Sequence, residues 1–249
     1  MFERGQGHQS SSERLLIRNI HTLNTNTKHR YVALLDSRGD LQSAVADADI
    51  AKDFVTKDFV REFESQIKSA SVVIVDANLS EDTLSEIGKL SSKTCWLEPT
   101  SVAKARSCVR AGLLKHITVI SPNEDELNGM ILELGDMQED EDLETKSKHL
   151  LKEMPSSSSV VVTLGERGAA IVDDQGVTYF KPGNVESVRN CTGAGDTLVG
   201  ATVWAMAHRN LNLHDAVRSV GMRAAERTLA SDEPVCPSLS SMEETGLFF

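Results

Sequence analysis

The sequence predicts an α/β fold with a central, mainly parallel β-sheet flanked by helices. From residue 31 onward, short runs of β-branched or apolar residues alternate with longer stretches of helical spacing, which is the order of elements in parallel sheets covered by helices. The runs are apolar throughout, as expected of buried strands. The composition, 40% hydrophobic and 25% charged, is that of a globular protein.

The first predicted elements are a hairpin and a helix. Residues 31–36 and 41–46 are apolar runs on either side of a turn at Gly39, which predicts a β-hairpin at a sheet edge. A helix is expected over residues 58–69, because its aromatic and aliphatic side chains recur at every fourth position.

The later elements continue the alternation of strands and helices. Strands are expected at residues 72–77, 94–99, 117–120, 159–165, 169–174 and 176–181. Helices are expected at residues 81–90 and 102–111 and from starts near Asn123, Gly193 and His214. Since no repeat or linker interrupts this order, we expect one domain over residues 31–240, a polar leader at 1–30 and a C-terminal tail at 241–249.

Charge and cysteine spacing exclude several classes of function. The chain has 249 residues, and 26 Lys and Arg against 37 Asp and Glu give a net charge of −11. DNA and anionic membranes repel such an anion, so we expect neither as a partner. No apolar stretch approaches the ~20 residues that span a bilayer. The four cysteines lie far apart, which argues against a zinc site and predicts a reducing compartment, with the cytoplasm as the default and an organelle not excluded.

The most informative segment joins a glycine-rich turn to a helix at residues 190–207. Gly193 and Gly195 allow close approach of the backbone to a ligand, and the free amides of a helix start favour phosphate. Asp196 stands inside this start, where a carboxylate could accept a proton from a hydroxyl that attacks the phosphate. A plain glycine turn with Asp196 as an early helix charge explains the same residues.

Three segments, in this order, resemble motifs of the ribokinase-like (pfkB) carbohydrate and nucleoside kinases. They are Pro-Asn-Glu-Asp-Glu-Leu at 122–127, Thr-Leu-Gly-Glu-Arg-Gly-Ala at 163–169 and Thr-Gly-Ala-Gly-Asp at 192–196. Within that family, residues 75–80 and 95–105 resemble the pseudouridine kinases. The resemblance implies a ribokinase-like three-layer fold, ATP as co-substrate, Mg²⁺, and phosphorylation of pseudouridine to pseudouridine 5′-phosphate.

The resemblance also implies a role for each matching residue. Asp196 would be the general base, and the amides of Gly193, Ala194 and Gly195 would form the anion hole. The residues expected to bind ATP are Asn123, Thr163, Gly165, Gly168 and Gly221. Glu126 would hold Mg²⁺ through water, Asn190 and Thr192 fall where relatives bind a monovalent cation such as K⁺, and Glu98 and Thr100 would contact the substrate.

Simpler structural roles stay open for several of these residues. Asn123 and Glu126 have the spacing of a helix cap and its capping-box partner, and residues 163–168 could form a plain hairpin turn. Residues 98–101 could end a strand, with Thr100 or Ser101 capping the next helix. Relatives often carry an aspartate at the position of Asn190, and the loss of that charge weakens the inference of potassium.

The first residues depart from the family pattern. Family members normally begin with a strand, a glycine pair and an aspartate that hold the sugar hydroxyls, and nothing in residues 1–30 resembles these elements. We therefore expect a domain that is incomplete at its N-terminal side. A catalytically inactive truncated isoform and a kinase for another sugar or nucleoside stay open as alternatives, and the resemblance allows a homodimer.

Overall fold

The computed structural model describes residues 30–35, 41–47, 49–135, 141–183, 185 and 187–239, with side chains from residue 51 onward. The strands are β1 (Arg30–Leu35), β2 (Leu41–Asp47), β3 (Val72–Asp76), β4 (Thr94–Glu98), β5 (Val119–Ile120), β6 (Ser159–Thr163), β7 (Ala169–Asp173) and β8 (Gly176–Phe180). The α-helices are α1 (Asp49–Phe54), α2 (Lys57–Arg61), α3 (Glu64–Ser69), α4 (Glu81–Leu90), α5 (Val102–Arg110), α6 (Glu124–Leu134), α7 (Leu143–Glu153), α8 (Ala194–Arg209), α9 (Leu213–Ala216) and α10 (Met222–Leu229).

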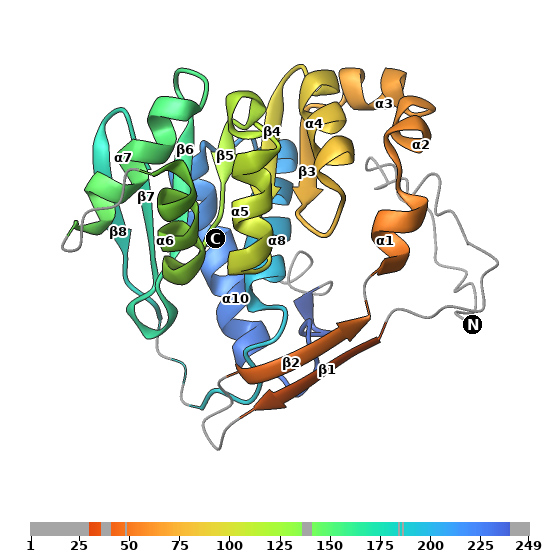
Figure 1. Cartoon of the computed structure of the whole chain (residues 1–249). Helices are drawn as coiled ribbons and strands as arrows, with labels where there is room; N and C mark the ends of the chain where they lie inside the picture. The colour runs from red at the N-terminus through yellow and green to blue at the C-terminus, as the bar shows by residue number, and fades with distance from the viewer. Residues whose placement is uncertain are drawn as a thin grey trace, which may run out of the picture.

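A six-stranded mixed sheet forms the centre of the fold. Its order is β3-β4-β5-β6-β7-β8, in which β3 to β6 run parallel and β7 and β8 are antiparallel to their neighbours. This arrangement confirms the predicted α/β class. Figure 1 shows α5, α6 and α7 in front of the sheet and α8 and α10 behind it, which makes three layers.

The predicted hairpin forms, but its predicted place is wrong. The strands β1 and β2 pair with each other in antiparallel register, from Arg30 opposite Asp47 to Leu35 opposite Leu41, and make a separate two-stranded sheet. In Figure 1 this ribbon lies across the lower side of the molecule, away from the edges of the large sheet. The alternation of a strand pair fixes which residues share a face, and it does not encode which sheet the pair joins. The expected turn at Gly39 lies outside the described residues.

The core consists of two apolar layers, one on each face of the sheet. Because successive strand residues point to opposite faces, Cys95 and Leu97 pack with the layer under α4 to α7, whereas Trp96 packs with the layer under α8 and α10. Val160 likewise packs in the layer of Leu97, and Val161 packs in the layer of Trp96. All of these side chains are fully buried. The apolar runs of β4, β6 and β7 are therefore covered on both faces, as predicted. The expectation is wrong for β3 and β8, the two edge strands of the sheet, which leave Ile74 and Tyr179 exposed.

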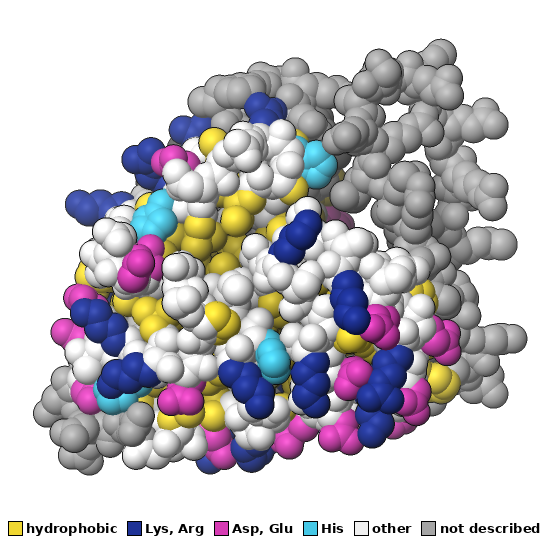
Figure 2. Space-filling model, turned by 90° about the horizontal axis from the view of Figure 1, so that it is seen from above, with side chains coloured by type: hydrophobic (Ala, Val, Ile, Leu, Met, Phe, Trp, Pro, Cys, Tyr) yellow, Lys and Arg dark blue, Asp and Glu magenta, His cyan; other side chains and the backbone are white. Residues whose placement is uncertain are grey.

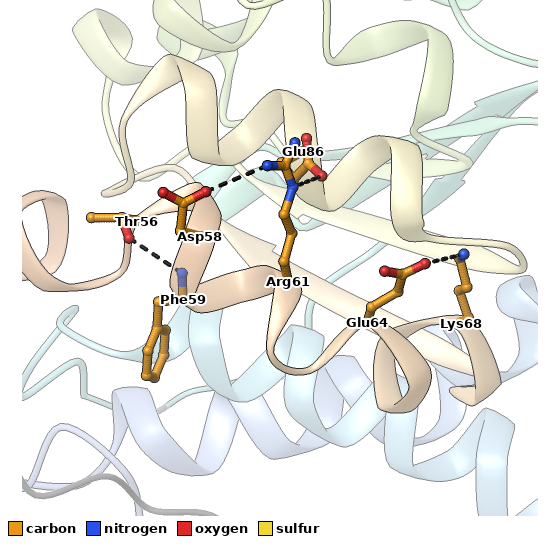
Figure 3. A network of polar contacts seen from close by, with 7 residues as sticks. All are labelled: Thr56, Asp58, Phe59, Arg61, Glu64, Lys68 and Glu86. Carbon is orange, nitrogen blue, oxygen red and sulfur yellow. Dashed lines mark hydrogen bonds and ion pairs between the residues drawn. The ribbon is translucent and has the colours of Figure 1, made fainter.

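The helix predicted over residues 58–69 is broken into α2 and α3, as Figure 3 shows. Thr56 caps α2, and the chain leaves helical geometry at Phe63, where φ is −105° and ψ is 14°. Only Val60 in these two helices is fully buried. A helix with so little buried surface gains little from packing, and packing is what stabilises most short helices.

One ion pair joins α2 to α4, and two others lie within α2 and α3. The Arg61 guanidinium donates to Glu86 Oε1 at 2.8 Å and lies 3.4 Å from Asp58 Oδ1 (Figure 3). The bond from Arg61 lowers the pKa of Glu86. Lys68 pairs with Glu64 one turn away. Exposed ion pairs of this kind each contribute little to stability.

The other helices that the sequence predicts form with small shifts. The helix α4 covers residues 81–90 as expected, α6 begins directly after Asn123, and α8 begins directly after Gly193. The expected strand at 117–120 shortens to Val119–Ile120. The last expected helix, near His214, divides into α9, a π-helix over Val217–Gly221 and α10.

The surface opposite the ribbon has a mixed charge. On the face in Figure 2, Lys and Arg side chains are interspersed with Asp and Glu around the rim, and apolar side chains show between them. The described side chains on that face form no broad basic patch of the kind that binds nucleic acid. Among the described residues, none of the helices combines the length and the apolar character needed to cross a membrane.

Two glycines on facing helices give the first prediction. A Cβ on Gly221 would lie 2.2 Å from Thr202 Oγ1 of α8, whereas Gly200 of α8 is exposed with nothing within 4 Å. We expect Gly221→Ala to lower the free energy of unfolding by about 1–3 kcal/mol through overpacking. Gly200→Ala is the control and should raise it by up to about 1 kcal/mol through helix propensity. Urea unfolding measures both, and equal effects would contradict this packing.

Candidate active site

The candidate residues gather at the carboxyl ends of the parallel strands. Asp76 ends β3, Glu98 ends β4, Ser121 directly follows β5 and Thr163 ends β6. The start of α8 reaches the same region, because the charges of Asp76, Glu126 and Asp196 all act on Glu98. Ligands of open α/β sheets bind at this edge. In Figure 1 it is the end of the sheet that faces the ribbon β1–β2.

The glycine-rich loop before α8 has the geometry of an anion site. Gly193 is the N-cap residue in a left-handed conformation, with φ at 79°, and its carbonyl accepts the amide of Thr197 at 2.9 Å. Within the described part of the chain, the amides of Gly195 and Asp196 have no hydrogen-bond acceptor. Unpaired amides at the start of a 16-residue helix attract a phosphate. Asp196 is exposed beside them.

The segment after α10 holds this loop in place. Asn190 Oδ1 accepts the amide of Thr192 at 2.9 Å, and Asn190 Nδ2 donates to the carbonyl of Asp232 at 3.4 Å. The Arg189 guanidinium donates to Asp232 Oδ2 at 3.0 Å. A Cβ on Gly193 would lie only 1.9 Å from the carbonyl oxygen of Pro234. The loop therefore depends on close backbone contact with residues 232–234.

A buried threonine joins α8 to the same segment. The hydroxyls of Thr197 and Thr228 lie 3.0 Å apart, and Thr228 Oγ1 accepts the amide of Cys236 at 3.3 Å. The side chain of Thr228 is fully buried. Thr197 directly follows Asp196, so Thr228 sets the orientation of the first turn of α8. Sequence reasoning missed it, because no motif signals a contact between two helices.

The start of α6 forms a complete capping box. The amide of Glu126 donates to Asn123 Oδ1 at 2.8 Å, and the amide of Asn123 donates to Glu126 Oε2 at 2.9 Å. The structural role foreseen for this pair is thus confirmed. Burial raises the pKa of Glu126, and the bond from the Asn123 amide opposes that shift. The backbone of Asn123 also bridges to Thr163, which brings two of the predicted ATP-binding residues together.

The turn after β6 contains two glycines in left-handed conformations. Gly165 has φ at 58° with nothing within 4 Å of a built Cβ, whereas a Cβ on Gly168, at φ 92°, would lie 2.1 Å from the carbonyl oxygen of Phe180. Gly168 is therefore required by the approach of β8, and Gly165 leaves open space at the site. An ion pair between Arg167 and Glu124 of α6 ties the turn to the capping box.

Glu98 lies in a chain of hydrogen bonds that the sequence did not reveal. Trp96 Nε1 donates to Ser121 Oγ at 2.7 Å, and Ser121 Oγ donates to Glu98 Oε2 at 2.7 Å. Trp96 and Ser121 are buried. Burial raises the pKa of Glu98 to about 8; the Ser121 bond opposes that shift, and the charges of Glu126, Asp196 and Asp76 add to it. A carboxyl in this environment is a candidate for a functional group.

Thr100, two residues further on, is strained and lacks a partner for its hydroxyl. Its φ is 63°, an unusual value for a β-branched residue. Its Oγ1 atom is buried without a hydrogen-bond partner within the described structure. Ser101 is the N-cap residue of α5, yet its side chain makes no capping bond. The helix-cap explanation of this segment is therefore wrong for both hydroxyls, and strain of this kind clusters at functional sites.

A second polar cluster, which sequence reasoning also missed, follows β3. The amide of Asn78 donates to Asp76 Oδ1 at 2.6 Å, and Lys104 of α5 donates to Asn78 Oδ1. Lys104 thus brings a positive charge to the sheet edge that carries Asp76 and Glu98. The signal that could have identified the cluster is the alternation of polar residues, Asp76, Asn78 and Ser80, at the end of a strand and directly after it.

Two expectations, a nucleotide contact at Gly221 and metal binding by side chains, gain no direct support from the geometry. Gly221 contacts Thr202 and the carbonyl of Leu198 in α8, so its small size serves helix packing. A nucleotide contact at Gly221 stays a prediction. Among the described residues, no group of three or more His, Cys, Asp or Glu side chains could hold a metal ion by itself.

Comparison with known families decides the class of the protein. The model of the pfkB family carbohydrate kinases matches residues 5–230. The chain belongs to the pfkB family. This match begins inside residues 1–30, which we expected to be a leader, so the leader boundary stays a prediction.

Individual relatives agree with the family. The chain is 29% identical to the pseudouridine kinase of Arabidopsis thaliana, over 81% of this chain and 68% of that protein. It is 26% identical to the pseudouridine kinase of Escherichia coli K12, over 70% of this chain and 54% of that protein. The crystal structure of the ribokinase of Thermotoga maritima superposes with a TM-score of 0.70 at 17% identity, over 87% of this chain and 69% of that one. The fold is therefore ribokinase-like, and the chain spans between about half and two thirds of these relatives.

The loop before α8 gives the second prediction. Gly193→Ala would place a methyl group against the Pro234 carbonyl at a positive φ, so we expect it to lower the free energy of unfolding by about 1–3 kcal/mol. The control is Gly195→Ala, because a Cβ there meets nothing within 4 Å. Thermal denaturation without ligand measures both variants. A Gly193→Ala protein as stable as Gly195→Ala would contradict the close contact.

Proposed function

We propose that this chain catalyses the ATP-dependent phosphorylation of a hydroxyl group of a nucleoside or sugar, with pseudouridine as the preferred substrate and pseudouridine 5′-phosphate as the product. One observation carries the proposal. An exposed carboxylate, Asp196, lies directly at a helix start whose amides are free, at the same sheet edge as a half-buried carboxyl, Glu98, and a strained threonine, Thr100. Membership of the pfkB family and the two pseudouridine kinase relatives support it.

Asp196 is the proposed general base. It takes the proton from the 5′-hydroxyl while that oxygen attacks the γ-phosphorus of ATP, and the bond from the γ-phosphorus to the bridging oxygen breaks to release ADP. Proton transfer to a positioned base contributes about 10² to 10⁴ in rate. The exposure of Asp196 leaves it accessible to a substrate hydroxyl.

The backbone of the α8 start is the proposed anion hole. The amides of Gly195 and Asp196 already lack an acceptor, and they lie next to the left-handed Gly193. Fixed donors of this kind stabilise charge as it develops, and each is worth about 2.7 to 4 kcal/mol in comparable acyl-transfer sites. The amides and the helix dipole therefore contribute more than the base itself.

The residues present fit a magnesium ion held largely by phosphate oxygens. Mg²⁺ commonly binds through one or two carboxylates, water and substrate phosphates rather than through a cage of side chains, which agrees with the lack of such a cage among the described residues. Glu126 uses Oε2 for the capping box, so its Oε1 is the oxygen proposed to accept from a magnesium-bound water. The ion would supply positive charge to the transferred phosphoryl group.

The residues present do not favour a potassium ion. The carboxamide of Asn190 is neutral and already bridges the amide of Thr192 and the carbonyl of Asp232. The Asn190 side-chain N–H group donates to the carbonyl oxygen of Asp232, and a bound cation would attract that oxygen instead. We propose that Asn190 and Thr192 shape the loop by hydrogen bonds, and no step of the mechanism uses K⁺.

Substrate recognition is assigned to Glu98 and Thr100. Both lie at the carboxyl end of β4, and both have polar atoms that the fold does not use: the Thr100 hydroxyl and Glu98 Oε1. A small-molecule substrate is the proposed partner. Location in the cytoplasm, assembly as a homodimer and phosphorylation of a different sugar or nucleoside stay predictions beside it.

Substitution of the base gives the third prediction. Asp196→Asn should lower turnover of pseudouridine and Mg·ATP by about 10² to 10⁴ and leave ATP binding within about twofold, because the amides that hold phosphate are unchanged. Asp58→Asn is the control, since Asp58 is also an exposed aspartate in the first turn of a helix, α2, on the far side of the fold. Coupled ADP release measures turnover, and calorimetry measures binding.

A substrate panel completes this test. Pseudouridine should be phosphorylated faster than adenosine, ribose and fructose at equal concentration. Much faster phosphorylation of one of the other three would overturn the pseudouridine assignment and keep the kinase. ATP binding without turnover of any of the four would support the alternative of an inactive chain.

A further inference from the structure

The hydrogen-bond chain behind Glu98 determines which of its two oxygens faces a ligand. The indole of Trp96 is only a donor, so Ser121 Oγ accepts from it and has one proton left to give. That proton goes to Glu98 Oε2 at 2.7 Å rather than to the carbonyl of Leu97 at 3.3 Å. Oε2 is therefore an acceptor, and a proton on this carboxyl would sit on Oε1.

The second oxygen is free and reachable. Glu98 Oε1 has no hydrogen-bond partner among the described residues, and it is absent from the buried atoms that lack one. The side chain as a whole is half-buried. Oε1 is thus the atom that a ligand at the carboxyl end of β4 would meet, two residues before the unpaired hydroxyl of Thr100.

The groups around Glu98 favour its neutral form. The charged groups that act on it are Asp76 from β3, Glu126 from α6 and Asp196 from α8, and all three are acidic. The positive charge of Lys104 from α5 lies at the same edge, where it bonds to Asn78. Burial and these charges raise the pKa of Glu98 to about 8. A negative charge here would also repel the phosphates expected at the start of α8.

We propose that Glu98 binds substrate as a neutral acid, with Oε1–H donating a hydrogen bond to an oxygen acceptor of the nucleoside, and that Ser121 and Trp96 are positioning residues that hold the proton on Oε1. The proposal rests on the proposed kinase function. A neutral Glu98 would favour substrates that place a carbonyl or ether oxygen, such as a pyrimidine ring carbonyl, next to Oε1–H. It would disfavour substrates that place only an N–H donor there. A buried donor strongly disfavours a ligand that leaves it unpaired.

The decisive comparison is between Glu98→Gln and Glu98→Ala. Glutamine keeps an acceptor for Ser121 and an N–H donor in place of Oε1–H, so kcat/KM for the nucleoside should stay within about threefold. Alanine removes the donor and should lower kcat/KM by about tenfold or more. A Glu98→Gln protein as impaired as Glu98→Ala would show that a carboxylate is required and would overturn the proposal.

The pH profile tests the proton directly. Because the neutral acid is the binding form, kcat/KM of the unchanged protein should fall as the pH rises through about 8, where Glu98 loses its proton. Glu98→Gln should not show this fall. Ser121→Ala should move the fall to higher pH, because the Ser121 bond favours the ionised form. If Ser121→Ala only disturbed the structure, the pH at which kcat/KM falls would stay unchanged.

A measurement without turnover separates this proposal from the kinase assignment. Carbon-13 NMR of glutamate-labelled protein, assigned by comparison with Glu98→Gln, reports the protonation of this carboxyl in the free protein. A neutral Glu98 at pH 7 supports the proposal even if another nucleoside is the better substrate. An ionised Glu98 at pH 7 overturns it, whatever the activity. Ser158→Ala controls for loss of a buried hydroxyl, since Ser158 donates to the carbonyl of Pro155 and directly precedes β6, at the opposite end of the sheet.

Discussion

The parallel register of β3 to β6 is the constraint on which the site depends. Val72 pairs with Thr94 and Asp76 with Glu98, so the last residues of two neighbouring strands end side by side. Trp96 and Leu97 pair with Val119 and Ile120, which brings Ser121 next to Glu98. A shift of one residue would turn each side chain to the opposite face of the sheet. The apolar layers on both faces hold this register, and the polar residues at its end share the same environment as a result.

The helices bring the second half of the chemistry to that edge. The capping box at Asn123 fixes the start of α6 beside β6, and the left-handed Gly193 fixes the start of α8. Side-chain caps hold the start of α6, and backbone contacts hold the start of α8, so the free amides of Gly195 and Asp196 keep their direction without a ligand. A site arranged in this way needs little reorganisation when charge develops on a phosphoryl group.

The order of elements and the local geometry of the candidate-site motifs could be predicted from the sequence, because each depends on local patterns. Apolar runs identified the strands, and the spacing of Asn123 and Glu126 identified a capping box. The contacts between motifs could not be predicted. The bond of Ser121 to Glu98 joins residues 23 positions apart, and that between Thr197 and Thr228 joins residues 31 positions apart. The break between α2 and α3 was missed for a related reason, since helical spacing does not show how much surface a helix will bury.

An acidic chain can bind a phosphate donor if the carboxyl groups nearest the binding site are partly neutral. Four carboxyl groups, Asp76, Glu98, Glu126 and Asp196, share one end of the sheet. If all were fully ionised, they would repel a nucleotide triphosphate. Burial raises the pKa of both Glu98 and Glu126, so the interior part of the site carries less negative charge than its composition indicates. Asp196, the proposed base, is exposed, and the unpaired backbone amides beside it are the proposed phosphate site. An acidic protein can therefore bind this anion without a basic surface.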